Sequence, residues 1–197
     1  PQIGVVIGDV SGHGVPAALL MTTARALLHG LLATGVSPEA TLPQLNQQLA
    51  VDVRPGHFMT LFCLWLDLDR RVATWASAGH EPALWWHAAT GEVTSLAGGD
   101  IPLGIDPAWQ FGPLEEACYQ EGDLLLLVTD GLCESRNSTG ESFGRERLRS
   151  LLQDSGGATA HAVVARVLAA LDAFAGPAPA RDDVTVVAVR VVPSSPA

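Results

Sequence analysis

The N-terminal part of the chain begins with a continuous apolar run and continues with two stretches of helical character. The run at residues 3–8, "IGVVIG", is rich in β-branched residues and predicts a buried strand. Residues 14–35 are apolar almost all round, which predicts a helix that is buried or packs against a partner. Ser37 and Pro38 are typical of an N-cap and a first helical residue, so a second helix is expected to begin there.

Short β-type runs follow, separated by turn residues. Within residues 58–98, runs such as "FMTLFCLWLDL" and "RVATWASAG" are broken by Asp-Arg, Gly-His-Glu-Pro and Thr-Gly, which predicts a meander of antiparallel strands. Further strands are expected at about 113–119 and at 123–129, and the second of these is fully apolar. Asp130 and Gly131 end it as a common turn pair.

The C-terminal part returns to helices before a last strand. The stretch "ESRNSTGES" predicts a polar loop, and helices are expected at about 143–154 and 159–174. A Pro-rich loop, "GPAPAR", precedes the final strand "DVTVVAVRVV", and residues 193–197 form a tail.

The order of these elements favours one fold class. Helices cluster in two pairs and the strands lie together between them, whereas a Rossmann-type fold would alternate strands with helices. The pattern predicts an α+β fold with two antiparallel sheets packed face to face and helices outside. At 197 residues the chain is expected to form a single domain over residues 1–192.

Composition and charge narrow the function classes. The formal net charge of −10 disfavours nucleic acid and anionic membranes as partners. Every basic residue is Arg, which excludes lysine Schiff-base chemistry and a P-loop lysine. We predict no uninterrupted apolar span of about 20 residues, no signal peptide and no contact with a membrane.

The cysteines indicate the redox compartment. Cys63, Cys118 and Cys133 lie in apolar or strand-like contexts and form no CxxC pair. An odd number without paired spacing favours buried free thiols over disulfides or a zinc site. Free thiols are typical of a reducing compartment, so a cytoplasmic location is expected.

Carboxylates stand at the ends of three predicted strands. Asp9 and Asp130 follow apolar strands, and Asp182 and Asp183 precede the last one. In antiparallel sheets such positions can share one edge, where unpaired carboxylates repel one another and raise each other's pKa. A divalent cation resolves this repulsion, and oxygen-only ligands select Mg²⁺ or Mn²⁺. Each aspartate alone is an ordinary turn residue, so both readings stay open at this point.

Two histidines are weaker candidates. His13, inside "GDVSGHG", is interpreted as loop scaffolding, as a catalytic helper or as a metal ligand, although imidazole suits Mg²⁺ and Mn²⁺ less well than carboxylate. His80, inside "SAGHEP", is expected to make local hydrogen bonds or to approach the site.

Several motifs occur in a specific order along nearly the whole chain. They are "GDVSGHGVPAALLM", "FMTLFCLWLD", "ASAGHEPALWW", "PLGI", "GDLLLLVTDGLCESRN", "FGRERL" and "RDDVTVVAVRV". This set resembles the metal-dependent Ser/Thr protein phosphatase (PPM, PP2C-like) family, in its bacterial SpoIIE/RsbU-like branch. The resemblance implies a four-layer α/β/β/α sandwich, two Mn²⁺ or Mg²⁺ ions, and hydrolysis of phosphoserine or phosphothreonine on a protein.

The resemblance also assigns roles to single residues. Asp9 matches the carboxylate that bridges both metals, and the backbone carbonyl of Val10 matches the ligand beside it. Asp130 and Asp182 match the remaining ligands, and Asp183 either supports them or exchanges roles with Asp182. The metals would lower the pKa of a bridging water that attacks phosphorus in line. Cys133, three residues after Asp130, is then expected to be structural.

Partners follow from the same resemblance. The implied substrate is a phosphorylated anti-sigma-factor antagonist of the STAS type, in bacterial stress or developmental signalling. Helices matching residues 14–52 act as a switch in this branch, so we hypothesise a homodimer through them or control by an upstream sensor domain.

One family feature is missing from the sequence. Family members carry an earlier strand with a "GGDxxD"-like segment that supplies another acidic residue, whereas this sequence starts eight residues before Asp9. We therefore expect a domain that is incomplete at its N-terminus, with a weak or absent second metal and an exposed sheet edge. The alternative function is a catalytically weak or inactive phosphatase-like module that binds a partner. A hydrolase of small phosphoesters is a third reading.

Overall fold

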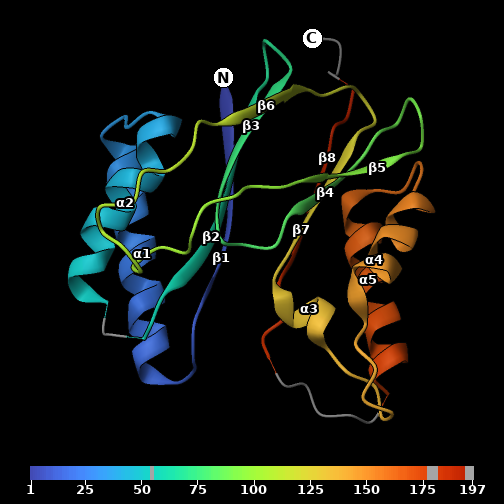
Figure 1. Cartoon of the computed structure of the whole chain (residues 1–197). Helices are drawn as coiled ribbons and strands as arrows, with labels where there is room; N and C mark the ends of the chain where they lie inside the picture. Colours follow the sequence, from blue (N-terminus) through green and yellow to red (C-terminus); the bar gives the residue numbers. More distant parts are fainter. Residues whose placement is uncertain (54–55, 177–181, 194–197) are drawn as a thin grey trace. The chain divides into compact units, whose positions relative to one another are not determined.

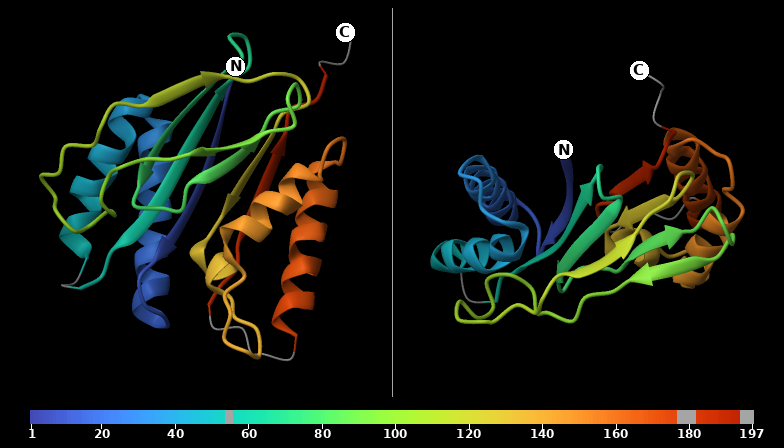
Figure 2. Two further views of the ribbon diagram at one scale, coloured as in Figure 1. Left: turned by 45° about the vertical axis from the view of Figure 1, so that its right-hand side comes forward. Right: turned by 90° about the horizontal axis from the view of Figure 1, so that it is seen from above.

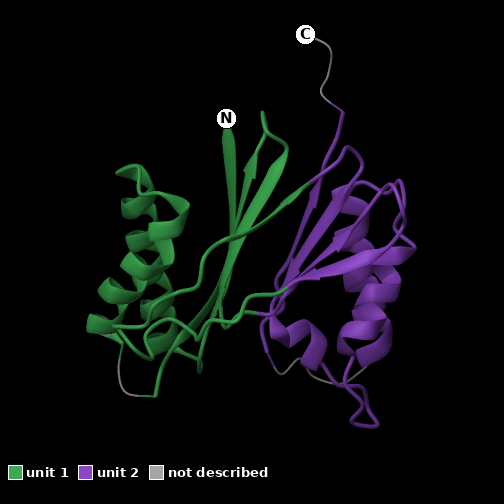
Figure 3. Cartoon of the chain, turned by 45° about the horizontal axis from the view of Figure 1, so that its top comes forward, with its two compact units in different colours: residues 1–80, 97–118 green, residues 81–96, 119–197 purple. Residues whose placement is uncertain are grey.

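Two four-stranded antiparallel sheets, each with its own helices, carry the fold (Figure 1). The structure is a computed structural model that describes residues 1–53, 56–176 and 182–193. The chain divides into two units (Figure 3). Unit 1 comprises residues 1–80 and 97–118, and unit 2 comprises residues 81–96 and 119–197.

Unit 1 contains the sheet with the strand order β1-β2-β3-β6, so β1 and β6 are its outer strands. A helix pair covers one face of this sheet (Figure 2). Alternate residues of β2, from Met59 to Trp65, pack with Leu42, Leu45 and Leu49 of the second helix in one core. Its elements are β1 (Gln2–Val10), α1 (Val15–Ala33), α2 (Pro38–Asp52), β2 (Met59–Asp67), β3 (Val72–Ala78) and β6 (Glu115–Cys118).

Unit 2 contains the sheet with the strand order β5-β4-β7-β8. Two helices pack on one face of it, where Leu124, Leu126 and Val128 share a core with Leu148 and Val163. The second of these helices begins after Thr159, whose side chain accepts a hydrogen bond from the Ala162 amide. Its elements are β4 (Ala83–Trp86), β5 (Val93–Leu96), β7 (Leu124–Val128), α3 (Asp130–Glu134), α4 (Gly144–Gln153), α5 (Ala160–Ala175) and β8 (Val186–Arg190).

The predicted helices and most strands are confirmed, but the single meander is wrong, and the strand expected to be buried at residues 3–8 has only Ile7 buried. β2 pairs with β3, and β4 pairs with β5, whereas β3 and β4 belong to different sheets. The Gly-His-Glu-Pro stretch at residues 79–82 therefore joins the two sheets instead of closing a hairpin. The pair Asp130-Gly131 opens the short helix α3 rather than forming a simple turn. The tail and most of the Pro-rich loop lie outside the described residues.

One of the three cysteines differs from the prediction. Cys63 and Cys133 are buried free thiols, as expected, whereas Cys118 is an exposed free thiol. Cys118 ends β6, an outer strand whose side chains are mostly exposed. An apolar residue in a strand-like context is thus no guarantee of burial when the strand lies at a sheet edge.

Helix α1 is long and apolar enough to cross a membrane by length and composition only, although Thr22, Arg25 and His29 interrupt its apolar surface. Its mean hydropathy over an 18-residue window is 1.4, and 17% of that window is buried. One such helix is weak grounds for a membrane span. Leu20, Ala24 and Leu31 anchor α1 in the core of unit 1. Its large exposed apolar side chains are Val15, Leu19, Met21 and Leu32.

A buried asparagine ties the loop before β6 to α2. The Asn46 amide donates from Nδ2 to the Asp106 carbonyl and accepts at Oδ1 from the Gly104 amide, both at 2.8 Å. The same loop is held to β2, because the main chains of Leu103 and Met59 exchange two hydrogen bonds. These hydrogen bonds make the loop part of the packed structure of unit 1.

Candidate metal centre

In unit 1, the predicted ligands Asp9 and Val10 lie at the end of β1. The strand continues through both residues, pairing Asp9 with Thr60 and Val10 with Met59, whereas the sequence predicted its end at Gly8. Gly8 has a packing role inside the strand. A Cβ atom there would come within 2.8 Å of the Leu61 and Met59 side chains and the Thr60 carbonyl.

The loop after Val10 turns back tightly towards α1. Gly12 and Gly14 have φ values of 86° and 77°, a conformation that favours glycine and confirms the predicted tight turn. Ser11 fixes the loop to the start of β2: its amide donates to the Phe58 carbonyl, and its hydroxyl accepts from the Phe58 amide. His13 is exposed in this loop.

In unit 2, Thr129 joins the end of β7 to the segment before β8. Its hydroxyl donates to the Asp183 carbonyl at 3.2 Å and accepts from the Thr185 amide at 3.0 Å. Its amide also donates to the Thr185 carbonyl. These bonds extend the β7–β8 ladder beyond Val128 and bring the segment with Asp182 and Asp183 beside the first turn of α3.

Two of the predicted ligands, Asp130 and Asp182, come together in unit 2. A carboxylate oxygen of Asp130 and one of Asp182 lie within 4.8 Å of each other. The Oδ1 atom of Asp130 is buried and makes no hydrogen bond within the described residues. Asp182 Oδ1 accepts from the Asp183 amide at 2.8 Å. A buried carboxylate oxygen without a donor, beside a second carboxylate, fits the ligand preference of a hard divalent cation.

Gly131 makes this close approach feasible. A Cβ atom on Gly131 would collide with the Asp183 carbonyl and would lie 3.2 Å from the Asp182 Cβ. Gly131 is not among the glycines with positive φ, so its backbone conformation does not itself require glycine. The requirement for glycine here is therefore one of space between α3 and the segment before β8.

The buried cysteines do not supply a nucleophile. Burial raises the pKa of the Cys133 thiol to about 11, and the charge of nearby Glu81 adds to this rise. Burial alone raises the pKa of Cys63 to about 12. Because the thiolate is the reactive form, both thiols stay protonated and inert near neutral pH. This geometry agrees with the structural role expected for Cys133.

Sequence reasoning missed two threonines that organise the site. Thr129 is 3% exposed and bonds the segment before β8, and Thr60 contacts the backbone of Asp9. Both residues are next to predicted metal ligands. Thr129 precedes Asp130, and Thr60 stands opposite Asp9 in the β1–β2 ladder. The first could have been found as a polar residue ending an apolar strand, but the second needs the strand register.

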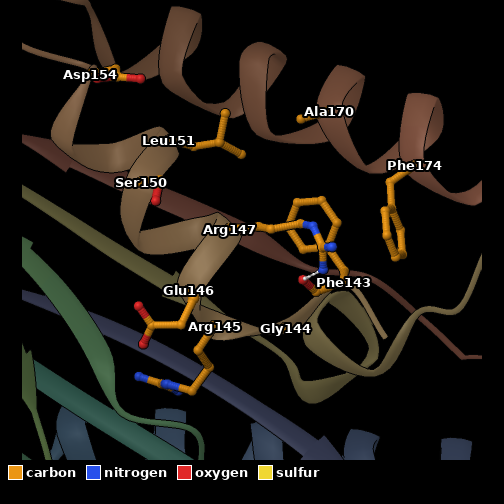
Figure 4. Close-up of a pocket in the computed structure, with 10 residues that line it drawn as sticks. All are labelled: Phe143, Gly144, Arg145, Glu146, Arg147, Ser150, Leu151, Asp154, Ala170 and Phe174. Carbon is orange, nitrogen blue, oxygen red and sulfur yellow. Dashed lines mark hydrogen bonds between the residues drawn. The ribbon is translucent and has the colours of Figure 1, made fainter. Parts of the chain in front are cut away.

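The large pocket of unit 2 is not part of this site. It has a volume of about 720 Å³ and lies between α4 and α5, with Phe143, Leu151 and Phe174 among its lining residues (Figure 4). Arg147 covers the Phe174 ring at 4.6 Å, and its guanidinium is bonded to Glu141. That bond lowers the pKa of the Glu141 carboxyl. None of the predicted metal ligands lines this pocket.

Comparison with known proteins identifies relatives along the whole chain. The sequence model of the family described as Stage II sporulation protein E (SpoIIE) matches residues 1–192. Phosphoserine phosphatase RsbU of Bacillus subtilis (strain 168) is 30% identical over 153 residues, which are 78% of this chain and 45% of RsbU. Phosphoserine phosphatase RsbP of the same organism is 30% identical over 137 residues, 68% of this chain and 34% of RsbP. The chain therefore spans less than half the length of these two relatives.

Solved structures share the fold. The RsbU and RsbW domains of a Mycobacterium tuberculosis protein match with a TM-score of 0.85 at 25% identity, over 99% of this chain and 53% of that one. Two structures of lower identity contain metals. RsbX in complex with magnesium matches at 18% identity with a TM-score of 0.68, over 95% of this chain and 80% of that one. The catalytic domain of the serine threonine protein phosphatase PstP, with two manganese ions, matches at 19% identity with a TM-score of 0.66. The match covers 96% of this chain and 88% of that one. The chain belongs to the SpoIIE family of PP2C-like phosphatase domains.

Proposed function

We propose that this chain hydrolyses phosphoserine or phosphothreonine on a protein, using bound Mn²⁺ or Mg²⁺. The observation that carries the proposal is the buried Oδ1 atom of Asp130, which accepts no hydrogen bond from the described residues and lies beside the Asp182 carboxylate. Similarity to the phosphoserine phosphatases RsbU and RsbP supports the reaction class.

The proposed metal ligands are Asp9, the Val10 carbonyl, Asp130 and Asp182, with Asp183 in support from the next position. These donors are all oxygens, which suits Mg²⁺ or Mn²⁺ better than zinc or copper. The magnesium of RsbX and the manganese of PstP support ions of this type, and the two manganese ions of PstP support a pair.

The residues of the chain position the reactants. Two bound cations would activate a water for in-line attack on phosphorus and neutralise the phosphoryl oxygens. Asp9 would hold both cations from the end of β1, while Thr129 keeps the Asp182 segment beside Asp130. Neither buried cysteine is needed as a nucleophile, in agreement with their raised pKa values.

We also propose that residues 1–192 form one domain, a four-layer α/β/β/α sandwich. Each sheet has a second apolar face opposite its helices. On β2 this face carries Phe62 and Leu64, and on β7 it carries Leu125 and Leu127, which alternate with the helix-facing residues. Packing these two faces together buries both, and the TM-score of 0.85 over 99% of the chain supports that arrangement.

The proposed substrate is a phosphorylated anti-sigma-factor antagonist of the STAS type, in the cytoplasm, under control of an upstream sensor domain. Similarity to the phosphoserine phosphatases RsbU and RsbP supports a phosphoserine substrate. The net charge of −10 disfavours nucleic acid and anionic membranes as partners.

A homodimer through residues 14–52 is a further part of the proposal. Val15, Leu19 and Leu32 of α1 are exposed apolar side chains that a second copy would cover. Leu28 is less suitable for a test, because it packs against the core of unit 1. Leu19→Glu with Leu32→Glu is expected to turn a dimer into a monomer in sedimentation velocity; a wild type that is monomeric at high concentration would exclude this interface.

The reaction is tested with p-nitrophenyl phosphate, a phosphoserine peptide and a phosphorylated STAS protein. Metal-free protein is expected to hydrolyse them only after Mn²⁺ is added, and an excess of EDTA should reverse the effect. Hydrolysis that is independent of Mn²⁺ would exclude the mechanism. Binding of the phosphoprotein without turnover would favour the alternative of an inactive binding module.

A further inference from the structure

We propose that His80 is a positioning residue for Asp9 and acts through Thr60. The proposal rests on the assignment of Asp9 as a metal ligand. All three residues belong to unit 1, so the contacts between them are set within one sheet and its connecting loops. His80 comes from the turn after β3, Thr60 from β2 and Asp9 from β1.

The three residues form a relay of hydrogen bonds. Thr60 stands directly opposite Asp9 in the β1–β2 ladder. The Thr60 hydroxyl donates to the Asp9 carbonyl at 3.4 Å, and the His80 Nδ1 atom lies 2.9 Å from the same hydroxyl oxygen. The 3.4 Å bond joins Thr60 to Asp9, and the 2.9 Å contact with His80 holds the Thr60 side chain in place.

The relay requires one form of the His80 ring. A threonine hydroxyl has a single hydrogen, and in the relay that hydrogen goes to the Asp9 carbonyl. The hydroxyl then accepts at its 2.9 Å contact with His80, which in this form carries its proton on Nδ1. In the opposite tautomer the Thr60 hydrogen would turn to Nδ1 and release the Asp9 carbonyl.

The His80 ring is itself held in place. It is 7% exposed, and its amide donates to the Ser77 hydroxyl while that hydroxyl donates to the His80 carbonyl. The turn is tight: Gly79 has a φ of 66°, and a Cβ atom there would lie 2.6 Å from Pro102. A ring on such a turn has little freedom, so it can impose one rotamer on Thr60.

The relay acts where β1 needs support. The paired part of β1 ends at Val10, one residue after Asp9, and β2 is its single neighbour among the described strands. Fixing the Asp9 backbone at this end limits the directions its carboxylate can take. Partners that orient a metal ligand are typically worth about 10- to 100-fold in metal affinity.

Metal affinity tests the relay directly. Mn²⁺ binding is measured by isothermal titration calorimetry on wild type, Thr60→Val and His80→Leu. Each variant is expected to bind about tenfold more weakly, and the double variant no more weakly than the worse single one. His80→Asn keeps a donor near the position of Nδ1 and is expected to restore most of the affinity.

A second readout does not need the metal. The ¹⁵N shifts of His80 in metal-free protein should report protonation at Nδ1, and Thr60→Val should lose the Nδ1 proton from slow exchange. Protonation at Nε2 alone overturns the proposal. So do variants with lowered thermal stability but wild-type Mn²⁺ affinity, because they would show a purely structural role.

Failure of the metal assignment gives a different pattern. If Asp9→Asn binds Mn²⁺ like the wild type, then Asp9 is no ligand and the metal assignment behind the proposed function fails. The His80 tautomer and the Thr60–His80 coupling would then still be observed, but Mn²⁺ affinity would not change in Thr60→Val. If Mn²⁺ affinity falls in Asp9→Asn but is unchanged in Thr60→Val and His80→Leu, only the relay is contradicted.

Discussion

Asp130→Asn is expected to lower Mn²⁺-dependent phosphatase activity by about a thousandfold or more, because metal stabilisation of a transferring phosphoryl group is worth several kcal/mol. The metal-free variant should be at least as stable as the wild type. Asp130 Oδ1 is a buried acceptor with no donor among the described residues, and the Asp182 carboxylate lies within 4.8 Å, so a neutral amide removes a like-charge repulsion.

The measurement is the thermal midpoint with and without Mn²⁺. A ligand at a hundred times its dissociation constant stabilises a protein by about 2.7 kcal/mol, so the wild-type midpoint should rise on adding metal. The Asp130→Asn midpoint should stay unchanged. Asp172→Asn, an exposed carboxylate on α5, serves as the matched control and should behave as wild type. An Asp130→Asn variant that gains stability from Mn²⁺ as the wild type does would contradict the ligand assignment.

Gly131→Ala is expected to destabilise unit 2 by about 1–3 kcal/mol and to weaken Mn²⁺ binding by about tenfold or more. The added Cβ atom meets the Asp183 carbonyl and the Asp182 Cβ, and the first of these is backbone that cannot rotate away. Relief requires the segment before β8 to move from α3, which separates Asp182 from Asp130. Both effects thus have one cause.

Urea unfolding and Mn²⁺ titration calorimetry of the same samples check this result. Gly99→Ala is the matched control, because its Cβ atom meets nothing within 4 Å and its φ lies outside the range that favours glycine. That control should stay within about 0.5 kcal/mol of wild type. Wild-type stability and metal affinity in Gly131→Ala would show that the packing of α3 on the segment before β8 is looser than the contacts indicate.

Local features of the fold could be predicted from the sequence, and non-local ones could not. The helix at 14–35 and the strand at 123–129 are correct to within a few residues, because apolar periodicity and run length are local signals. The pairing of β2 with β3 and of β4 with β5 in separate sheets depends on contacts between distant residues. Turn residues at 79–82 look the same whether a chain closes a hairpin or changes sheet.

The site shows the same division. The aspartates could be predicted because carboxylates at strand ends are visible in a sequence, and Asp130 and Asp182 do meet in unit 2. The packing role of Gly8 could not be predicted, since it depends on Met59 and Leu61 of the neighbouring strand. Asp130-Gly131 looks like a turn pair from composition alone, and only the close approach of the 182–183 segment explains why glycine opens a helix there.

The outer position of β1 has a thermodynamic consequence. Asp9 sits on a strand that has one hydrogen-bonded neighbour among the described residues, so its other edge is open to a further strand. Anything that pairs with that edge restricts the backbone of Asp9 before the cation arrives. Binding free energies are reciprocal. The proposed cation at Asp9 would therefore raise the affinity of β1 for an added strand by the same factor by which that strand raises the affinity for the cation. The concentration of free manganese would then set how firmly this edge holds its neighbour.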